Sequence, residues 1–153
     1  MTNPGTERRR SVIAGEGLFT TRPFAAGERI ARYAGTTSVT PPPPSDGMVF
    51  GLEVRPGLWL DGSSEDNPAR AANHSCEPNA DLIWDEAEAA AWLSARQNLP
   101  ASTEVTFDYG FSLAEALTHP CLCGSPSCVG RIVAAPLRAG LRRHLRHPGA
   151  RRD

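Results

Sequence analysis

Four cysteines carry the most distinctive chemistry of this chain: Cys76, Cys121, Cys123 and Cys128. The last three are spaced C-x-C-x4-C, which places three thiolates on one short loop, whereas a structural zinc ion takes four ligands in a tetrahedron. Two disulfides are the alternative use of four cysteines, and they are typical of secreted proteins. Because no export signal is recognisable at the N-terminus, the cysteine content favours zinc.

Three further motifs mix polar and aromatic residues in a way that core packing does not explain. Residues 73–79, NHSCEPN, have no core-forming pattern, which is typical of a loop placed for function. Residues 107–110, FDYG, follow a segment rich in β-branched residues. Gly15-Glu16-Gly17 allows the backbone to approach a ligand closely, although such a glycine pair is by itself most often a turn.

The elements that position these motifs are expected to be short. The 153 residues fit one domain, and 14 glycines with 14 prolines predict many turns. Residues 1–10 are polar and charged without periodicity, which favours disorder. The proline-rich stretch 36–47 is expected to form an exposed connection. Apolar and β-branched runs predict strands at residues 11–13, 18–19, 30–33, 49–54, 58–60 and 104–109.

One segment admits two structures. Residues 85–97 have the composition of a helix, because alanine and glutamate dominate them. They lack a clean 3.6-residue repeat, however, so a hairpin between residues 82–84 and 91–93 is the alternative.

The C-terminal segment is predicted to be a short basic helix. Leu137, Leu141 and Leu145 recur every four residues, which gives one apolar stripe. Between Pro136 and Asp153 there are six arginines against one aspartate, a net charge of +5 in a chain whose net charge is −1. Such a segment packs its leucines on the domain, which is the simpler interpretation, or contacts the phosphates of nucleic acid.

The overall composition is that of a globular protein, with 40% hydrophobic and 22% charged residues. No window approaches the roughly 18 apolar residues that a membrane helix needs. We therefore expect a soluble cytoplasmic protein without membrane contact. All 16 basic residues are arginine, so the chain has no lysine.

Taken together, the motifs resemble those of the SET-domain family. NHSCEPN, EVTFDYG and CLCGSPSCVG are similar to the family's Asn-His-x-Cys loop, its Phe-Asp-Tyr strand and its post-SET cysteine cluster, in the family's order. GEGLFTTRPFAAGERIARYAG resembles the family's opening, with a Tyr-x-Gly element at its end. The resemblance covers about residues 12–132.

The resemblance implies a mainly β SET fold of small curled sheets with few short helices. In this fold the NHSC segment and the FDY strand form a knot-like crossing, and a post-SET zinc loop follows. It also implies a hairpin around residues 85–90. The expected organisation is a disordered N-terminus at 1–10, a SET domain at 11–118, a zinc motif at 119–132 and a basic helix or tail at 133–153.

The resemblance further implies a protein-lysine N-methyltransferase that moves a methyl group from S-adenosylmethionine to a lysine ε-amine and leaves S-adenosylhomocysteine. Tyr109 takes the place of the catalytic tyrosine, and Tyr33 that of a tyrosine lining the lysine channel. Without the motifs, both would be read as ordinary core residues. Phe107 stands where the family has tyrosine or phenylalanine, and phenylalanine implies di- or trimethylation.

The binding residues are implied in the same way. Backbone groups of the opening motif meet the cofactor, and the NHSC loop binds its amino group and adenine edge, so the predicted cofactor-binding residues are Gly15, Glu16, Gly17, Leu18, Asn73 and His74. By itself His74 would more often be structural. One structural zinc ion, taking no part in the chemistry, is held by Cys76, Cys121, Cys123 and Cys128.

The chain also departs from the family's pattern, and two rival functions stay open. Arg70 is kept ahead of the NHSC loop, but Ala71 replaces an aromatic residue. The first rival is a catalytically inactive SET-like binding module, and the second is a nucleic-acid-associated zinc module that uses the arginine-rich tail. The expected partner of the enzyme is a lysine-containing protein, with a basic histone-like or nucleoprotein substrate as the favoured class.

Overall fold

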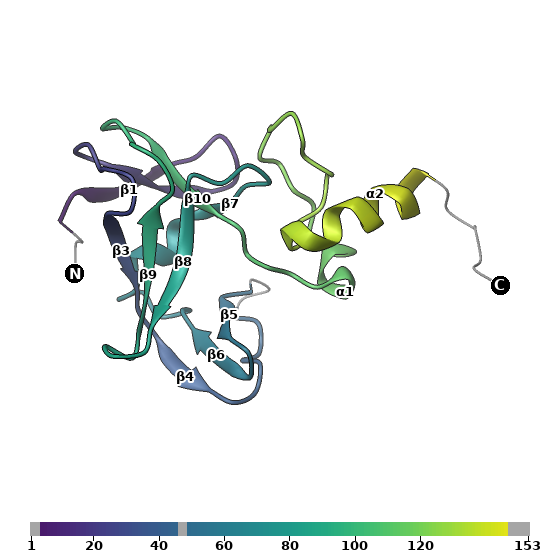
Figure 1. Cartoon of the computed structure of the whole chain (residues 1–153), viewed down its shortest axis with the longest axis horizontal. Coiled ribbons are helices and arrows are strands. Elements are labelled where there is room, and N and C mark those ends of the chain that lie inside the picture. Colours follow the sequence, from purple (N-terminus) through teal and green to yellow (C-terminus); the bar gives the residue numbers. More distant parts are fainter. Residues whose placement is uncertain (1–3, 46–48, 147–153) are drawn as a thin grey trace.

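The computed structural model describes residues 4–45 and 49–146, which form three small sheets followed by short helices (Figure 1). The first sheet has the strand order β1-β2-β10-β7. Neighbours pair antiparallel except β7 and β10, whose parallel pairing places Asn73 beside Thr106 and His74 beside Phe107. This pair joins the two segments that the sequence predicts to cross. The strands are β1 (Thr6–Arg10), β2 (Glu16–Thr20), β7 (Asn73–His74) and β10 (Glu104–Phe107).

The disorder predicted for residues 1–10 is wrong for the part that the structure describes, because strand β1 lies there. Residues 1–3 lie outside the described part. Every residue of β1 pairs with β2, from Thr6 opposite Thr20 to Arg10 opposite Glu16. The guanidinium of Arg9 also lies 4.7 Å from the centroid of the Phe19 ring. Backbone pairing and arginine stems therefore stabilise a strand that composition alone assigns to a disordered tail. The strand predicted at residues 11–13 is a bend instead.

The second sheet decides between the two structures that residues 85–97 admit. β8 (Ala80–Asp85) and β9 (Ala90–Ala95) form an antiparallel hairpin, and β9 also pairs with β3 (Arg29–Tyr33). In the turn, the Asp85 carboxylate accepts hydrogen bonds from the backbone N–H groups of Ala87 and Glu88. Burial of β9 between its two neighbours overrides the helix propensity of its alanines.

The third sheet has the order β4-β6-β5, with β4 (Thr36–Ser38), β5 (Gly51–Arg55) and β6 (Leu58–Asp61). The stretch 36–47, predicted to be an exposed connection, therefore begins with a short strand. Its described remainder, residues 39–45, is irregular and mostly exposed, and residues 46–47 lie outside the described part.

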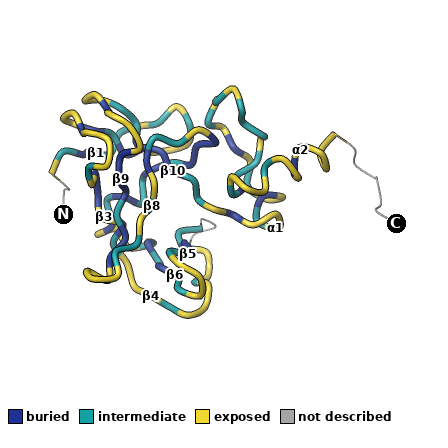
Figure 2. The backbone as a smooth tube through the Cα atoms, viewed as in Figure 1, coloured by how far each residue is buried: buried dark blue, intermediate teal, exposed yellow. Residues whose placement is uncertain are grey.

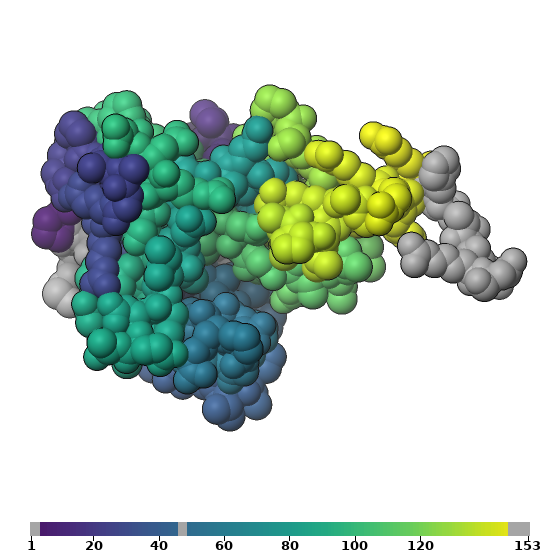
Figure 3. All heavy atoms as spheres, in the orientation of Figure 1, coloured from purple at the N-terminus to yellow at the C-terminus, as the bar shows by residue number. Residues whose placement is uncertain are grey.

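The C-terminal segment projects to one side of the sheets, and its helix α2 is exposed along most of its length (Figures 2 and 3). The helical elements of the described chain are η1 (Pro68–Ala71), α1 (Leu113–Ala116), η2 (Ala135–Leu137) and α2 (Arg138–Arg146). α2 confirms the predicted helix for residues 138–146, and the tail beyond it lies outside the described part. Leu141 is buried against Ala116 and Val133 in a small second core. Leu137 and Leu145 remain 37% and 46% exposed, so one leucine of the stripe is fully buried.

Among the described helices, none has the length and apolarity to cross a membrane.

Candidate active site and metal centre

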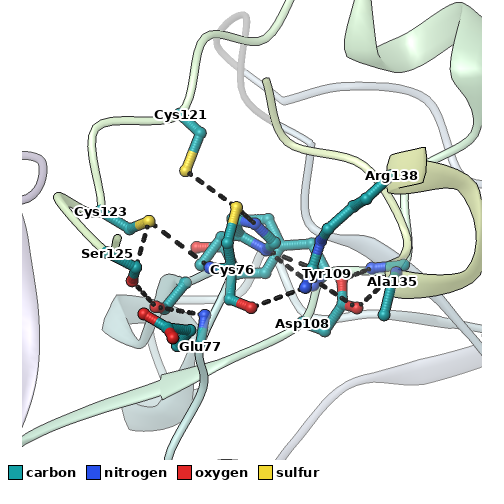
Figure 4. Close-up of polar contacts among 12 residues, drawn as sticks. Cys76, Glu77, Asp108, Tyr109, Cys121, Cys123, Ser125, Ala135 and Arg138 are labelled. Carbon is teal, nitrogen blue, oxygen red and sulfur yellow. Dashed lines mark hydrogen bonds and ion pairs between the residues drawn. The ribbon is translucent and has the colours of Figure 1, made fainter. Parts of the chain in front are cut away.

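The four cysteines lie together although they come from segments about 45 residues apart. Their sulfur atoms all fall within 4.8 Å of one another. Cys76 Sγ is 3.9 Å from Cys121 Sγ, and Figure 4 shows these two residues together with Cys123. Four thiolates at a zinc–sulfur distance of about 2.3 Å in a tetrahedron are themselves about 3.8 Å apart. The donor set and its spacing therefore fit a structural zinc ion.

The surroundings of the cluster favour a thiolate at one of its members. Burial raises the pKa of Cys76 and Cys121. Burial also acts to raise the pKa of Cys123, but hydrogen bonds from the backbone of Cys76 and from Ser125 outweigh it and lower that pKa to about 6. The Cys76 backbone N–H donates to Cys123 Sγ at 3.5 Å, and the Ser125 hydroxyl lies 3.3 Å from the same sulfur. Cys123 is thus prepared to ligate a cation at neutral pH.

A cavity of about 490 Å³ runs between the first sheet, the third sheet and the cysteine-bearing loop. It is lined by eight of the residues predicted for the site: Gly15, Glu16, Tyr33, Asn73, His74, Phe107, Tyr109 and Cys121. Gly17 and Leu18 do not line it, and the Leu18 side chain is fully buried in the core. The structure thus brings the opening motif, the NHSC loop, the FDY strand and the zinc loop to one place.

An aromatic wall closes one part of this cavity. The ring of Tyr109 lies 4.9 Å from that of Phe107 and 5.5 Å from that of Phe111, and Tyr33 contacts Phe107 edge-on at 6.2 Å. The Tyr109 hydroxyl donates to the Ala72 carbonyl at 2.8 Å. Burial raises the pKa of both tyrosines, so their hydroxyls are neutral at physiological pH. Sequence reasoning missed Phe111, which carries no motif signal beyond its place after FDYG.

The side chains of Asn73 and His74 hold neighbouring backbone segments of the site in place by hydrogen bonds. The Asn73 amide nitrogen donates to the carbonyl oxygens of Ala14 and Glu16, each at 3.1 Å. His74 Nδ1 accepts the backbone N–H of Tyr109 at 3.2 Å. Burial lowers the pKa of His74 to about 4, so the imidazole is neutral at pH 7. These contacts fix the opening loop and the backbone at Tyr109 relative to one another.

Glu104 is a further brace that sequence reasoning placed only in a strand. Its Oε1 accepts hydrogen bonds from Ser11 Oγ at 2.6 Å and from Asn73 Nδ2 at 2.9 Å. A Cβ on Gly17 would lie 2.4 Å from the same oxygen. Gly17 is therefore required by its close approach to this carboxylate, which holds the opening loop against β7.

Tyr33 is held by a buried polar contact that the sequence does not reveal. Asn67 is fully buried, and its amide donates to the Gly62 carbonyl at 2.9 Å and accepts the Ala34 N–H at 3.0 Å. A Cβ on Gly62 would lie 2.1 Å from Tyr33 Cε1 and 2.7 Å from Asn67 Nδ2. The glycine thus lets the tyrosine ring and the amide pack directly on the backbone.

Substituting Gly62→Ala should destabilise the protein by about 1–3 kcal/mol, because the added methyl group displaces Tyr33 or Asn67 from a packed site. Gly140→Ala is the matched control, since a Cβ there meets only the flexible end of Arg143 at 4.0 Å. In an exposed helix this control should stabilise by about 0.5–1 kcal/mol. Chemical denaturation measures both, and equal stabilities of the two variants would contradict the packing at Gly62.

The comparisons with known proteins agree with this geometry. Residues 15–110 match the family model of the SET domain, a span of well over half the chain. The chain belongs to the SET-domain family. The matched span of this SET domain contains the opening motif, the NHSC loop and the FDY strand.

Similar SET-domain proteins include histone-lysine N-methyltransferase ash1 of Drosophila melanogaster, which is 33% identical over 141 residues. Histone-lysine N-methyltransferase SETD1B of Homo sapiens is 31% identical over 134 residues. The alignments cover 84% and 80% of this chain. They span only 6% and 7% of the two relatives, so the chain corresponds to a small part of each.

Two solved structures share the SET fold, both of KRYPTONITE at 27% identity over 83% of this chain. One is a complex with mCHG DNA and SAH, with a TM-score of 0.66 and 28% of that chain covered. The other contains mCHH DNA, an H3(1-15) peptide and SAH, with a TM-score of 0.67 and 29% of that chain covered. The mainly β SET fold predicted from the sequence is confirmed.

Proposed function

We propose that this SET domain is a protein-lysine N-methyltransferase that uses S-adenosylmethionine and releases S-adenosylhomocysteine. The observation that carries the proposal is one cavity in which the predicted cofactor residues meet a wall of aromatic rings. Two further findings support it: the relatives are named histone-lysine N-methyltransferases, and the similar structures contain SAH.

The cofactor end of the cavity offers groups that suit an amino acid and a nucleoside. S-adenosylmethionine supplies a methyl group on a sulfonium sulfur. Gly15 and Glu16 line the cavity, and the backbone contacts predicted for Gly17 and Leu18, which do not line it, stay predictions. Asn73 uses its amide nitrogen within the protein, so its oxygen is the group that accepts from the cofactor's amino group.

Arg8 and Arg70 line the same cavity and carry the charge that a carboxylate needs, and in this structure both pair with Glu65. Arg8 is held by the Asn67 carbonyl at 2.9 Å, and Arg70 lies over the Phe50 ring at 5.0 Å. Ala71, where the family has an aromatic residue, also lines the cavity. Phe50 lines the cavity as well and offers it an aromatic ring.

The aromatic end suits the acceptor, because methyl transfer needs a neutral amine. Free lysine has a pKa of about 10.4, and a narrow apolar channel lowers it by disfavouring the ammonium. Tyr33 and Tyr109 present neutral phenol oxygens there. Since the Tyr109 proton is donated to the Ala72 carbonyl, the lone pairs of its oxygen remain to orient the amine.

Phe107 is the residue that should set the degree of methylation. It is 1% exposed and packed between Tyr33 and Tyr109, so an added hydroxyl would occupy space beside the amine. Wild type should form di- or trimethyl-lysine, and Phe107→Tyr should shift the product toward monomethyl-lysine by about tenfold. Mass spectrometry of a peptide substrate measures the ratio, and wild type that stops at monomethyl-lysine after long incubation would contradict the assignment.

The cysteine cluster is proposed to hold one structural zinc ion. Cys121 and Leu122 line the cavity, so the metal's cross-link between Cys76 and the 121–128 loop builds one wall of the site. All four ligands come from the protein, which is the composition of a structural rather than a catalytic zinc site. A cytoplasmic location stays a prediction.

Incubation with isotope-labelled cofactor and a lysate of lysine-rich proteins, followed by mass-spectrometric localisation of methyl-lysine, tests the proposed function. The chain has no lysine, so self-methylation at lysine gives no background. Transfer of label to protein lysines is the expected result. Cofactor binding without transfer to any protein would instead favour the inactive binding module.

The substrate is proposed to be a lysine-bearing protein of the histone-like class, since the relatives are named for histone lysine and one similar structure contains an H3 peptide. Nucleic-acid contact through the arginine-rich tail stays a prediction. Arg142 donates to the Ser127 carbonyl and Leu141 is buried, which supports the alternative that α2 packs on the domain.

A further inference from the structure

Arg138, the first residue of α2, is unlike the other arginines of the basic helix. Its side chain is only 15% exposed and points toward Cys76 and Asp108 (Figure 4). Nη1 donates to the backbone carbonyl of Cys76 at 2.6 Å, and Nη2 donates to Asp108 Oδ2 at 3.1 Å. One guanidinium thus joins three segments: α2, the cysteine of the NHSC loop and the residue before Tyr109.

Asp108 is the common acceptor of this arrangement. Its Oδ2 also accepts the backbone N–H of Ala135 at 2.9 Å, and its Oδ1 accepts the N–H of Gly110 at 2.9 Å. The carboxylate therefore fixes the backbone on the far side of Tyr109 and ties it to the start of the C-terminal helix. Because Asp108 is 26% exposed and Arg138 15%, this ion pair is only partly screened by solvent.

Cys76 has all its polar groups engaged once Arg138 is included. Its N–H donates to Cys123 Sγ at 3.5 Å, its sulfur lies within the cluster, and its carbonyl accepts from Arg138 at 2.6 Å. Outer contacts of this kind orient metal ligands and are typically worth 10- to 100-fold in metal affinity. The arginine thus acts on the cluster through the ligand's backbone.

We infer that Arg138 is a positioning residue of the active site, which locks the Cys76 loop to the end of β10 and so holds the metal centre and Tyr109 in one arrangement. This inference rests on the proposed function. α2 is then a part of the catalytic domain and not a detachable basic tail. Geometry, more than charge, is the requirement, because a guanidinium fork spans two acceptors and an ammonium reaches one of them.

The test compares Arg138→Ala and Arg138→Lys with Arg32→Ala. Arg32 is an exposed residue of β3, its side chain lies on the face of the strand opposite to the buried Tyr33, and the described structure shows no polar side-chain contact for it, so this control removes the same charge from the protein surface. Three quantities are measured on each zinc-loaded protein: kcat with KM for S-adenosylmethionine, the rate of zinc loss to a chromophoric chelator, and the melting temperature.

Arg138→Ala should lower kcat by about 10- to 100-fold, the size of effect that loss of positioning produces. It should also release zinc about tenfold faster, as expected for loss of an outer contact of a ligand. Arg138→Lys should fall between this variant and wild type, and Arg32→Ala should equal wild type within about twofold in both quantities, as surface substitutions usually do.

The inference is overturned if Arg138→Ala has a lower melting temperature but the same kcat and zinc loss as Arg32→Ala, since that is a purely structural role. If Arg138→Ala does not fold, the comparison of Arg138→Lys with Arg32→Ala decides in the same way. If wild type transfers no methyl group, the proposed function fails, while the rate of zinc loss still decides whether Arg138 holds the metal centre.

Discussion

Replacing Tyr109 by phenylalanine should lower kcat for methyl transfer by about 100- to 1000-fold, the cost of removing one preorganised polar group from a dry site. The substitution removes one oxygen and keeps the ring between Phe107 and Phe111. Loss of the hydrogen bond to the Ala72 carbonyl should cost about 1 kcal/mol of stability, too little to unfold the domain. Single-turnover transfer of labelled methyl groups measures the rate.

Binding of S-adenosylhomocysteine, measured by calorimetry, is the control for Tyr109→Phe. The cofactor affinity should change by less than about threefold, because the lost group acts on the amine and the transferring methyl group. Tyr33→Phe is the matched variant: it removes a hydroxyl whose partner is the Phe50 carbonyl at 3.2 Å, and its rate should fall by only about tenfold. A Tyr109→Phe enzyme as fast as wild type would remove the assigned role from this residue.

Removing zinc, or substituting Cys121→Ser, should abolish methyl transfer together with the structure of the 121–132 loop. Structural zinc contributes about 10–16 kcal/mol to the folding of small zinc-binding domains. Because all four cysteines of the chain belong to the cluster, a thiol reagent should find four reactive thiols after chelation and far slower reaction before it. Metal analysis should give one zinc per wild-type chain.

Ser125→Ala is the control for the zinc experiment. Its hydroxyl lies 3.3 Å from Cys123 Sγ but supplies no ligand, so this variant should still carry one zinc ion and keep most of its activity, while it loses zinc about tenfold faster than wild type, as expected for an outer contact. A metal-free preparation with full activity would refute the role of the ion as a wall of the site.

The chemistry of the site could be predicted from the sequence more fully than its scaffold could. Cys76, Tyr109 and His74 sit in motifs whose order and spacing mark them, and the structure brings them to one cavity and its metal centre. β1 was missed because a polar segment gives no hydrophobic pattern, and its stability comes from backbone pairing with β2. Propensity favoured a helix at 85–97, and burial between two strands made it a hairpin.

The supporting residues were missed for a common reason. Glu104, Asn67 and Arg138 act through partners that lie far away in sequence: Arg138 binds acceptors 62 and 30 residues earlier, and Glu104 binds Ser11 across 93 residues. The local sequence does not indicate such contacts, because charge patterns and secondary-structure propensities depend on residues that are close together in the sequence. Only the folded arrangement shows which arginine of a basic helix is a part of the site.

The pairing of β2 with β10 has a consequence for how the protein is made. The opening loop at Gly15 leaves the ribosome before β10, which pairs with β2, and before the cysteines at 121–128. A nascent chain therefore holds no complete cavity until translation has passed Arg138, and shortened products should have no partial activity. Loop closure over such distances also makes assembly of the pocket a slow, late step of folding.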